Sequence, residues 1–322
     1  MENLQHPLSN WIPYKLIEKD NEVYFEWIYL SNLNFLEPFF DETMSKCRSH
    51  EYNSKRMKVV SSVENVIEWA DELESVELKS LVFHVSRCGS TMLSQSLATS
   101  SENIMISEGP VFDQILRSDN FGLDKKATLL KSVLKFLGQK RFPEQKNLIL
   151  KLDAWHIFNA GYLRTIFPDI PFGLLYRNPV EVLKSHQKLM GMHMVPNLIP
   201  PTVFGISAQE IEEISFQQYG ALVLEKYFKG FLDFYETDQN VILLNYNEGM
   251  KNVIENFISF INVDYEVNER EKMFERLKKH SKNGNVVFEG DSFKKEALEI
   301  DFAKVNLLHE KLNNAKPEYL EH

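Results

Sequence analysis

Residues 81–93 read LVFHVSRCGSTML, and this stretch determines the fold that the sequence predicts. Its first five residues, Leu81–Val85, form a short apolar run between polar residues, which predicts a buried strand of a parallel sheet. Small and hydroxyl-bearing residues follow, and Thr91–Ala98 then has a helical pattern. The stretch therefore predicts a strand, a tight turn and a helix, with the turn at the carboxyl end of the strand.

The same alternation continues along the chain. Further short apolar runs predict strands at residues 103–107, 148–152, 172–176 and 241–245. Helical patterns occupy residues 125–139, 154–167, 208–235, 250–261 and 268–280, and another helix opens at Asn178-Pro179. Strands that alternate with helices predict a parallel sheet covered by helices on both faces. The expected fold class is α/β.

Composition limits the classes of function. The chain has 322 residues, 43% hydrophobic and 25% charged, which is typical of a globular protein. The net charge of −10 argues against a general affinity for nucleic acid or anionic membranes, so a bound polyanion would need a local cluster of donors. Cys47 and Cys88 are far apart in the sequence and predict neither a disulfide framework nor a metal site.

The pattern of residues also predicts a location and a domain organisation. The N-terminus has no basic segment followed by an apolar run, and the apolar stretches are too short to span a bilayer, so we expect a soluble cytoplasmic protein. Residues 1–75 are rich in aromatic side chains and form an expected accessory region. Residues 76–319 form the expected α/β domain. Residues 320–322, Leu-Glu-His, resemble the start of an expression tag.

The turn after the first α/β strand has the composition of an anion site. A strand that ends in a turn and a helix presents backbone N–H groups and the positive end of a helix dipole. Gly89 allows close approach of the backbone, Ser90 and Thr91 add hydroxyl donors, and Arg87 adds a forked cation. The loop lacks the first glycine and the lysine of the nucleotide triphosphatase motif. The alternative is an ordinary strand–turn–helix connection with a Ser/Thr cap.

This segment resembles the 5′-phosphosulfate loop of sulfotransferases, in which a basic residue, a small residue, glycine and two hydroxyl residues follow the first strand. Those places hold Arg87, Cys88, Gly89, Ser90 and Thr91. Arginine at the basic place is similar to the tyrosylprotein and bacterial branches of the family, whereas Cys88 replaces the usual serine. The resemblance implies a P-loop NTPase-like three-layer fold and 3′-phosphoadenosine-5′-phosphosulfate (PAPS) as co-substrate, with no metal required.

A second candidate phosphate site begins at Arg177, just beyond the expected strand 172–176. Ligands of open α/β sheets bind at such strand ends. Ser185 lies eight residues on, about two helical turns if the helix opens at Pro179. The pair resembles the sulfotransferase site for the 3′-phosphate of PAPS. The alternative makes Arg177 a surface charge and Ser185 an ordinary helix residue.

Glu108 is the candidate general base. It follows the expected strand 103–107, 21 residues past Arg87. In tyrosylprotein sulfotransferases and their bacterial relatives a glutamate at nearly this separation is the general base, and Glu108 resembles it. The alternative is a solvated loop acid or a charge at a helix start.

Lys151 ends the expected strand 148–152 together with Leu152, and packing alone explains a lysine poorly at this place. It resembles the lysine that stabilises the transition state in the tyrosylprotein branch. Asp153 is expected to orient Lys151 or to cap the next helix. His156 is a rival base that resembles, in residue type, the histidine of the small-molecule branch. Its place inside an expected helix favours Glu108.

Two later segments resemble nucleotide-binding parts of the same family. Tyr246 follows the expected strand 241–245 and either contacts the adenosine or is a half-buried aromatic residue. Lys282, in Ser281-Lys282-Asn283-Gly284, occupies the region where sulfotransferases close a basic loop over PAPS, with Lys294 and Lys295 downstream. The glycine-rich signature of that loop is degraded in this chain.

Together these features predict a sulfotransferase that moves a sulfuryl group from PAPS to a hydroxyl or amine, with Glu108 as base and with Lys151 and Arg87 as stabilising cations. The acceptor could be a small molecule, a peptide or a carbohydrate. One alternative is an ATP-dependent kinase, which needs a loop lysine and acidic Mg²⁺ ligands, for which Asp153 is the one candidate. The other is a non-catalytic nucleotide-binding protein on the same fold.

Overall fold

The computed structural model describes residues 6–20, 22–54, 58–212, 214–280 and 300–316. The chain forms two compact units. The first unit comprises residues 1–79, 94–151 and 266–276, and the second comprises residues 80–93, 152–265 and 277–322. The predicted division of the chain between residues 75 and 76 concerns domain organisation and stays a prediction.

A five-stranded sheet confirms the predicted α/β class. Its order is β5-β6-β4-β7-β8. The strands are β4 (Glu77–His84), β5 (Asn103–Ser107), β6 (Asn147–Lys151), β7 (Phe172–Tyr176) and β8 (Val241–Asn245). The pairs β5–β6, β4–β7 and β7–β8 are parallel. Every residue of β5, β6, β7 and β8 is buried, which explains why these strands appear in the sequence as continuous apolar runs.

The predicted strands agree closely with these bounds. The expected bounds of β5, β7 and β8 are confirmed, and those of β6 differ by one residue. β4 begins four residues before the expected start at Leu81, because its first residues, Glu77–Lys79, are exposed or half-buried and lack the apolar signal.

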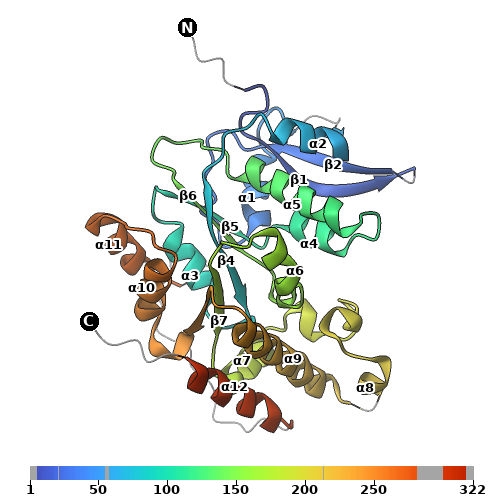
Figure 1. Cartoon of the computed structure of the whole chain (residues 1–322), viewed down its shortest axis with the longest axis vertical. Coiled ribbons are helices and arrows are strands. Elements are labelled where there is room, and N and C mark those ends of the chain that lie inside the picture. The colour runs from blue at the N-terminus through green and yellow to red at the C-terminus, as the bar shows by residue number, and fades with distance from the viewer. Residues whose placement is uncertain (1–5, 21, 55–57, 213, 281–299, 317–322) are drawn as a thin grey trace. The chain divides into compact units, whose positions relative to one another are not determined.

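The N-terminal part of the first unit is an antiparallel sheet with two helices packed beside it (Figure 1). Its elements are β1 (Trp11–Lys19), β2 (Glu22–Tyr29), β3 (Val59–Ser62), α2 (Val63–Ala70) and α5 (Leu123–Leu137). Trp27 of β2 packs edge-on against Phe136 at 4.8 Å between ring centroids, and its Nε1 donates to Ser61 Oγ at 2.9 Å. Gln139, just past α5, accepts the Asn10 N–H and donates to a carbonyl of β1. The accessory residues therefore share one core with the helix at residues 123–137.

Three further helices belong to the first unit. They are α1 (Phe40–Cys47), α4 (Pro110–Arg117) and α11 (Val267–Arg276). The sequence analysis did not predict α4, which has only eight residues. Gly109 is its N-cap and Pro110 occupies its first turn, where proline suits a helix. α4 therefore begins two residues after Glu108.

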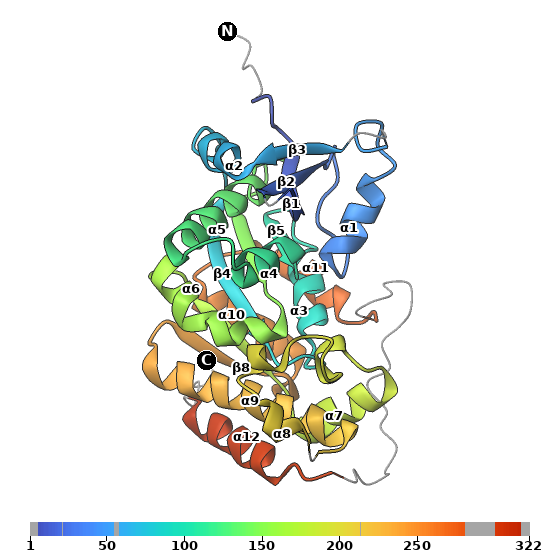
Figure 2. The ribbon, with the colours of Figure 1, turned by 90° about the vertical axis from the view of Figure 1, so that its right-hand side faces the viewer.

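In the second unit, α12 (Ala303–Ala315) runs beside α9 (Phe216–Thr237), as Figure 2 shows. The buried face of α9 is rich in aromatic residues: Tyr219, Tyr227, Phe228 and Phe231. The predicted single helix at residues 208–235 is wrong, because α8 (Ala208–Glu212) and α9 are separate. Ser215 caps α9 by accepting the Gln218 N–H at 3.1 Å, and a capping serine starts a new helix.

Other helices follow the prediction with small changes. α3 (Ser90–Leu97) and α10 (Met250–Phe260) lie within about two residues of their expected bounds, and α7 (Pro179–Lys188) begins where a helix was expected to open. The helical pattern at 154–167 forms a 3₁₀ helix, η1 (Ala154–Asn159), and then α6 (Ala160–Ile166). The sequence analysis did not predict α12.

Candidate functional site

Each strand of the five-stranded sheet ends beside a candidate residue. Glu108 follows β5, Lys151 closes β6, and the loop at 85–89 follows β4. Arg177 follows β7 and Tyr246 follows β8. The carboxyl ends of strands are where open α/β sheets bind ligands, so the sequence and the structure select the same end of each strand.

The loop at residues 85–89 has an unusual backbone in the second unit. Ser86 and Arg87 have φ angles of 64° and 49°, and Gly89 has a φ of 86°. Non-glycine residues in this left-handed region cost on the order of 1–3 kcal/mol each, and they concentrate at functional sites. Turns with left-handed residues gather successive N–H groups into concave anion sites. Because α3 starts at Ser90, the first-turn N–H groups of this helix also face the loop end.

Gly89 is required both by its φ and by the space around it. A Cβ built on Gly89 would lie 2.4 Å from Cδ2 and 2.6 Å from Cε2 of Tyr246. Real Cβ atoms do not approach ring carbons this closely. The Tyr246 ring therefore packs directly on the loop, and glycine is the residue that permits it.

The side chains of the loop divide between the interior and the surface. The Cys88 thiol is buried and donates to the carbonyl of Leu175 in β7 at 3.3 Å. Because the Cys88 side chain is directed at β7, only the backbone of this residue can contact a ligand at the loop. Ser90 and Thr91 are the first two residues of α3, as expected. Ser90 is buried and Thr91 is half-buried.

Arg87 is half-buried, and burial lowers its pKa. Its Nη2 donates to the carbonyl of Leu189, just past α7, at 2.6 Å. The loop arginine thus has a backbone partner in this structure. An anion at the loop would compete with that carbonyl for the guanidinium.

Arg177 is only 5% exposed, which confirms that it is not a surface charge. Its guanidinium lies 4.3 Å above the centre of the Tyr246 ring. Its Nε contacts the Glu181 carboxylate at 2.6 Å. The Tyr246 ring therefore contacts Gly89 on one side and Arg177 on another, so that both predicted phosphate-binding elements meet at one aromatic side chain. Whether this ring contacts an adenosine stays a prediction.

Glu181 and Asn247 complete this cluster, and the sequence analysis missed both. Asn247 Nδ2 donates to Glu181 Oε1 at 3.3 Å, and the Asn178 N–H donates to Asn247 Oδ1 at 2.8 Å. Asn178 also caps α7, with Pro179 in the first turn as predicted. The four-residue spacing from Arg177 to Glu181 was the available signal, because side chains at this spacing meet on a helix.

Ser185 lies on α7, one turn beyond Glu181 and on the same helix face. It is half-buried. The Glu181 carboxylate thus occupies the helix face between Arg177 and Ser185, where the resemblance implies a 3′-phosphate. The role of Ser185 in binding that phosphate stays a prediction. Lys282, together with the rest of the expected basic loop at 281–295, lies outside the described residues.

In the first unit, Glu108 and Lys151 form an ion pair. Strands β5 and β6 are in register at Ser107 and Lys151, and the Glu108 N–H donates to the Lys151 carbonyl at 2.8 Å. The Lys151 Nζ lies 3.0 Å from Glu108 Oε1. Glu108 has a φ of 56°, a further non-glycine residue in the left-handed region. The parallel pairing of the two strands therefore positions the two candidate catalytic groups side by side.

Lys151 is fully buried, with 0% of its surface exposed, whereas the Glu108 side chain is 23% exposed. Burial of a lysine is costly unless the charge is paired. The Phe39 ring supplies a second favourable contact, 5.3 Å from the ammonium. Among the described residues the Lys151 ammonium has no hydrogen bond of good geometry, although its distance to Glu108 is that of an ion pair. The Glu108 carboxylate and the Phe39 ring are therefore the two favourable contacts of this ammonium in the part of the chain that the structure describes.

Asp153 and His156 form a capping pair at the start of η1, in the second unit. The Asp153 side chain accepts the backbone N–H of His156, and the His156 ring accepts the Asp153 N–H. The expectation that Asp153 caps this helix is confirmed. Nδ1 of the buried His156 is therefore engaged in this cap, and its role as a rival base stays a prediction.

His186 is a buried group that the sequence analysis did not single out. It lies on α7 at 3% exposure, and its Nδ1 accepts the Gly191 N–H at 3.2 Å. Burial lowers the pKa of His186 to about 3, with further lowering by His193 and Arg87. The imidazole is therefore neutral at physiological pH and lies within electrostatic range of the loop arginine.

Neither a metal-binding cluster nor a membrane-spanning helix is present in the described part of the chain. It contains no group of three or more His, Cys, Asp or Glu residues arranged to hold a metal ion. None of its helices is long and apolar enough to cross a membrane.

No protein-family model and no curated protein sequence matches this chain. Several solved structures do match. Sulfotransferase STF9 from Mycobacterium avium is 13% identical, with a TM-score of 0.45 over 80% of each chain. The sulfotransferase domain from the curacin biosynthetic pathway is 15% identical, with a TM-score of 0.40 over 77% of this chain and 93% of its own. Mouse sulfotransferase SULT7A1, complexed with PAP, is 13% identical, with a TM-score of 0.33 over 68% of this chain and 72% of its own. These likenesses are distant, so the function is argued from the residues of this chain.

Proposed function

We propose that this protein is a sulfotransferase that moves a sulfuryl group from PAPS to a hydroxyl or amine of its acceptor. The observation that carries the proposal is the contact of Tyr246 with both Gly89 and Arg177. One unit of the protein thereby connects the left-handed loop expected at a 5′-phosphosulfate with the buried arginine expected at a 3′-phosphate. A nucleotide with phosphates on both ribose positions matches this pair of cationic elements.

The residues divide the chemical work as follows. Glu108 accepts the proton of the acceptor hydroxyl or amine while the new bond to sulfur forms. The bond between sulfur and the bridging oxygen breaks, and the electron pair stays with the 5′-phosphate of the leaving nucleotide. Lys151 and Arg87 stabilise the negative charge of the transferring group and of that phosphate. No proton donor or metal ion is needed for charge balance, because the leaving group departs as an anion.

Two contacts would have to change when the nucleotide binds. Arg87 would exchange the Leu189 carbonyl for an anion, and Arg177 would exchange the Glu181 carboxylate for the 3′-phosphate. Both exchanges replace one oxygen acceptor by another with more charge. Arginine favours the phosphate in such a competition, because a phosphate carries more charge than a carboxylate or a carbonyl and accepts two parallel hydrogen bonds from the guanidinium.

The test is thermal stability with 3′-phosphoadenosine-5′-phosphate (PAP), ADP, and ATP with and without Mg²⁺. A ligand that binds only the folded protein raises the melting temperature. We expect a metal-independent rise with PAP that is much smaller for Arg177→Ala. The control is Lys229→Gln, which removes an exposed cation of α9.

Each other result would point to a different function. A rise with ATP and Mg²⁺ alone would contradict the sulfotransferase and favour a kinase. Binding of PAP without sulfuryl transfer to a broad panel of phenols, alcohols and amines would favour a non-catalytic nucleotide-binding protein. No shift with any nucleotide would contradict all three.

A further inference from the structure

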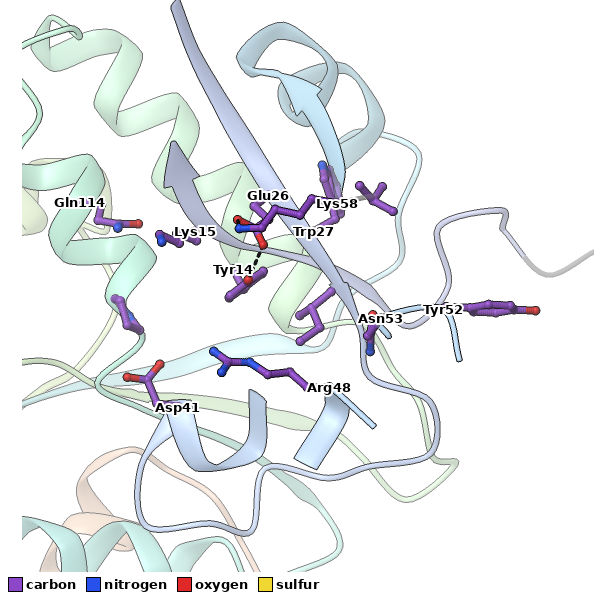
Figure 3. Close-up of a pocket in the computed structure, with 13 residues that line it drawn as sticks. Tyr14, Lys15, Glu26, Trp27, Asp41, Arg48, Tyr52, Asn53, Lys58 and Gln114 are labelled. Atoms are coloured by element: carbon purple, nitrogen blue, oxygen red, sulfur yellow. Dashed lines mark hydrogen bonds and ion pairs between the residues drawn. The ribbon is translucent and has the colours of Figure 1, made fainter. Parts of the chain in front are cut away.

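The first unit contains a cavity of about 610 Å³ that none of the proposed catalytic residues lines (Figure 3). This volume is within the range of small-molecule pockets in proteins. Its walls come from β1, β2, α1 with the loop after it, the start of β3 with the residue before it, and α4. The accessory region thus supplies most of the lining of this pocket, with α4 as the remaining wall, and the aromatic and charged residues of that region need an explanation beyond packing.

One pair of charges in the cavity is satisfied by the protein. Glu26 is 5% exposed, and its carboxylate accepts from Tyr14 Oη at 2.7 Å and from Lys58 Nζ at 2.8 Å. Burial alone would raise the pKa of Glu26, but these two hydrogen bonds, together with the charges of Lys58 and Lys15, outweigh burial and lower it. Glu26 therefore stays ionised and engaged with Tyr14 and Lys58, and it leaves the other charges of the cavity to be explained.

The remaining charged residues that line the cavity include more cations than acids. Lys15, Arg48 and Asp41 also line the cavity, so its five charged residues comprise three cations and two acids, a net charge of +1. The chain as a whole has a net charge of −10. Among the described residues, no ion pair or side-chain hydrogen bond engages Lys15 or Arg48. Lys15 acts on Glu26 through its charge alone, so an acidic protein directs at one cavity two cations that are not held in an ion pair with a described residue.

The orientation of these side chains supports a shared ligand. In Figure 3, Arg48 extends from the end of α1 toward Asp41, below the Tyr14–Glu26 hydrogen bond. Burial raises the pKa of the Tyr14 hydroxyl, as does its bond to Glu26, and the nearby Arg48 acts against this rise. Trp27, Ile28 and Pro110 supply apolar lining. The cavity therefore suits a small molecule with an apolar body and an anionic group.

Two walls of the cavity start beside the candidate catalytic pair. Pro110, in the α4 wall, follows Glu108 by two residues. Asp41, in the α1 wall, follows Phe39 by two residues, and the Phe39 ring lies 5.3 Å from the Lys151 ammonium. Two residues of chain span at most about 7 Å. A molecule in the cavity could therefore extend a hydroxyl or amine toward Glu108 without leaving the first unit.

We propose that this cavity binds the acceptor, and that the acceptor is a small molecule with an anionic group of its own, held by Arg48 and Lys15. The proposal rests on the proposed function, because the acceptor is defined by sulfuryl transfer. A carboxylate and a phosphate or sulfate ester share the recognising chemistry, which is a charge-assisted hydrogen bond from guanidinium or ammonium.

The test uses three phenols that differ only in the group opposite the hydroxyl: 4-hydroxybenzoate, 4-hydroxyphenyl phosphate and methyl 4-hydroxybenzoate. Each is titrated calorimetrically into the full-length protein with and without PAP. The variants are Arg48→Gln and Lys15→Gln, both at exposed positions that should tolerate the change. The control is Lys19→Gln, which removes an exposed cation from the same strand outside the cavity.

We expect an anionic phenol to bind the wild type more tightly than the methyl ester. Loss of a charged hydrogen bond of about 1.5–3 kcal/mol should raise its Kd by about 10- to 100-fold in Arg48→Gln. Lys15→Gln should have a smaller effect in the same direction, and Lys19→Gln should have none. The stronger of the two anions identifies whether a carboxylate or a phosphate is preferred.

Three results would overturn the proposal: equal binding of all three phenols, equal effects of Arg48→Gln and Lys19→Gln, or no binding of either anion at millimolar concentration. The titrations with and without PAP distinguish a failure of this proposal from a failure of the proposed function. PAP binding without anion selectivity would reject the acceptor cavity alone. If the protein does not bind PAP but binds an anion in a way that depends on Arg48, the cavity remains a ligand site and sulfuryl transfer is rejected.

Discussion

Lys151 and Arg177 make an instructive comparison, because each is a buried cation at the end of a parallel strand and each contacts a glutamate. Lys151 ends β6 in the first unit and lies 3.0 Å from Glu108. Arg177 follows β7 in the second unit and lies 2.6 Å from Glu181. By composition the two pairs are alike, and both could be taken as simple ion pairs that stabilise the fold.

They differ in how the carboxylate is held. Glu108 is fixed by the register of β5 and β6, by a backbone hydrogen bond and by a left-handed backbone that the tertiary structure maintains. Glu181 is one turn into α7 and its side chain is 33% exposed, so rotation into water is open to it. We interpret the first as a permanent partner suited to a base, and the second as a carboxylate that occupies an anion site until phosphate replaces it.

The largest expected effect is on the permanent pair. Glu108→Gln keeps the size of the side chain and removes the base, so kcat should fall by about 10²- to 10⁴-fold. Steady-state kinetics with saturating PAPS, beside calorimetry with PAP, would measure it. The PAP affinity should stay at its wild-type value. Glu77→Gln, an exposed acid at the start of β4, is the control. Equal losses of turnover and nucleotide affinity would contradict the assignment.

The next effect concerns the second pair. Arg177→Ala removes a buried guanidinium, and its charged hydrogen bonds to a phosphate are worth about 1.5–3 kcal/mol. The Kd for PAP should therefore rise by about 10- to 100-fold, while kcat at saturating PAPS changes far less. A variant that binds PAP normally but turns over slowly would reverse the roles that we assign to Arg177 and Glu108.

His186 is a further buried titratable group, but it stays neutral at physiological pH, whereas Lys151 and Arg177 are paired with carboxylates. Its pKa in the folded protein is about 3, below the ordinary value near 6.5, because of burial, His193 and Arg87. Between these pH values the unfolded chain binds a proton that the folded protein excludes. Stability should therefore fall as the pH drops below about 6.5, by at most about 1.4 kcal/mol per pH unit.

The measurement is the melting temperature from pH 7 to pH 5 for the wild type and for His186→Asn. Asparagine keeps an acceptor for the Gly191 N–H, so the fold should survive. The variant should lose less stability than the wild type on acidification. Parallel curves would mean that another group dominates this range.

The smallest effect tests the idea of the occupied anion site directly. Glu181→Gln removes a half-exposed competitor for Arg177, and such a pair is worth up to about 1 kcal/mol. PAP should bind about 2- to 5-fold more tightly, the opposite sign to Arg177→Ala. Weaker binding would show that Glu181 supports the nucleotide site rather than competing for it.

Local sequence was sufficient for several features. The expected strands at 103–107, 172–176 and 241–245 are confirmed, because fully buried strands are continuous apolar runs. The helix opening at Pro179 and the cap at Asp153 are confirmed, because capping depends on side chains within three residues. The predicted helix at 208–235 failed for a related reason, since the capping serine within it outweighed the helical pattern on either side.

Other features depend on residues far apart in the chain. The antiparallel sheet of residues 11–62 was not predicted, because its strands are half-buried and alternate irregularly. The contact of Tyr246 with Gly89 joins residues 157 positions apart, and no local pattern contains it. The cavity near Arg48 was missed for the same reason, because five separate segments line it.

The sequence by itself determined the α/β class, the order along the chain of the strands of the five-stranded sheet, and the residues that follow each of those strands. These properties follow from short-range periodicity, turn chemistry and capping. The tertiary structure alone decided that Glu108 pairs with Lys151, that Glu181 pairs with Arg177, and that accessory residues and α4 line one cavity with a net positive charge. Such pairings depend on strand register and on packing between distant segments, and the free energy of burial that selects them is a property of the folded chain as a whole.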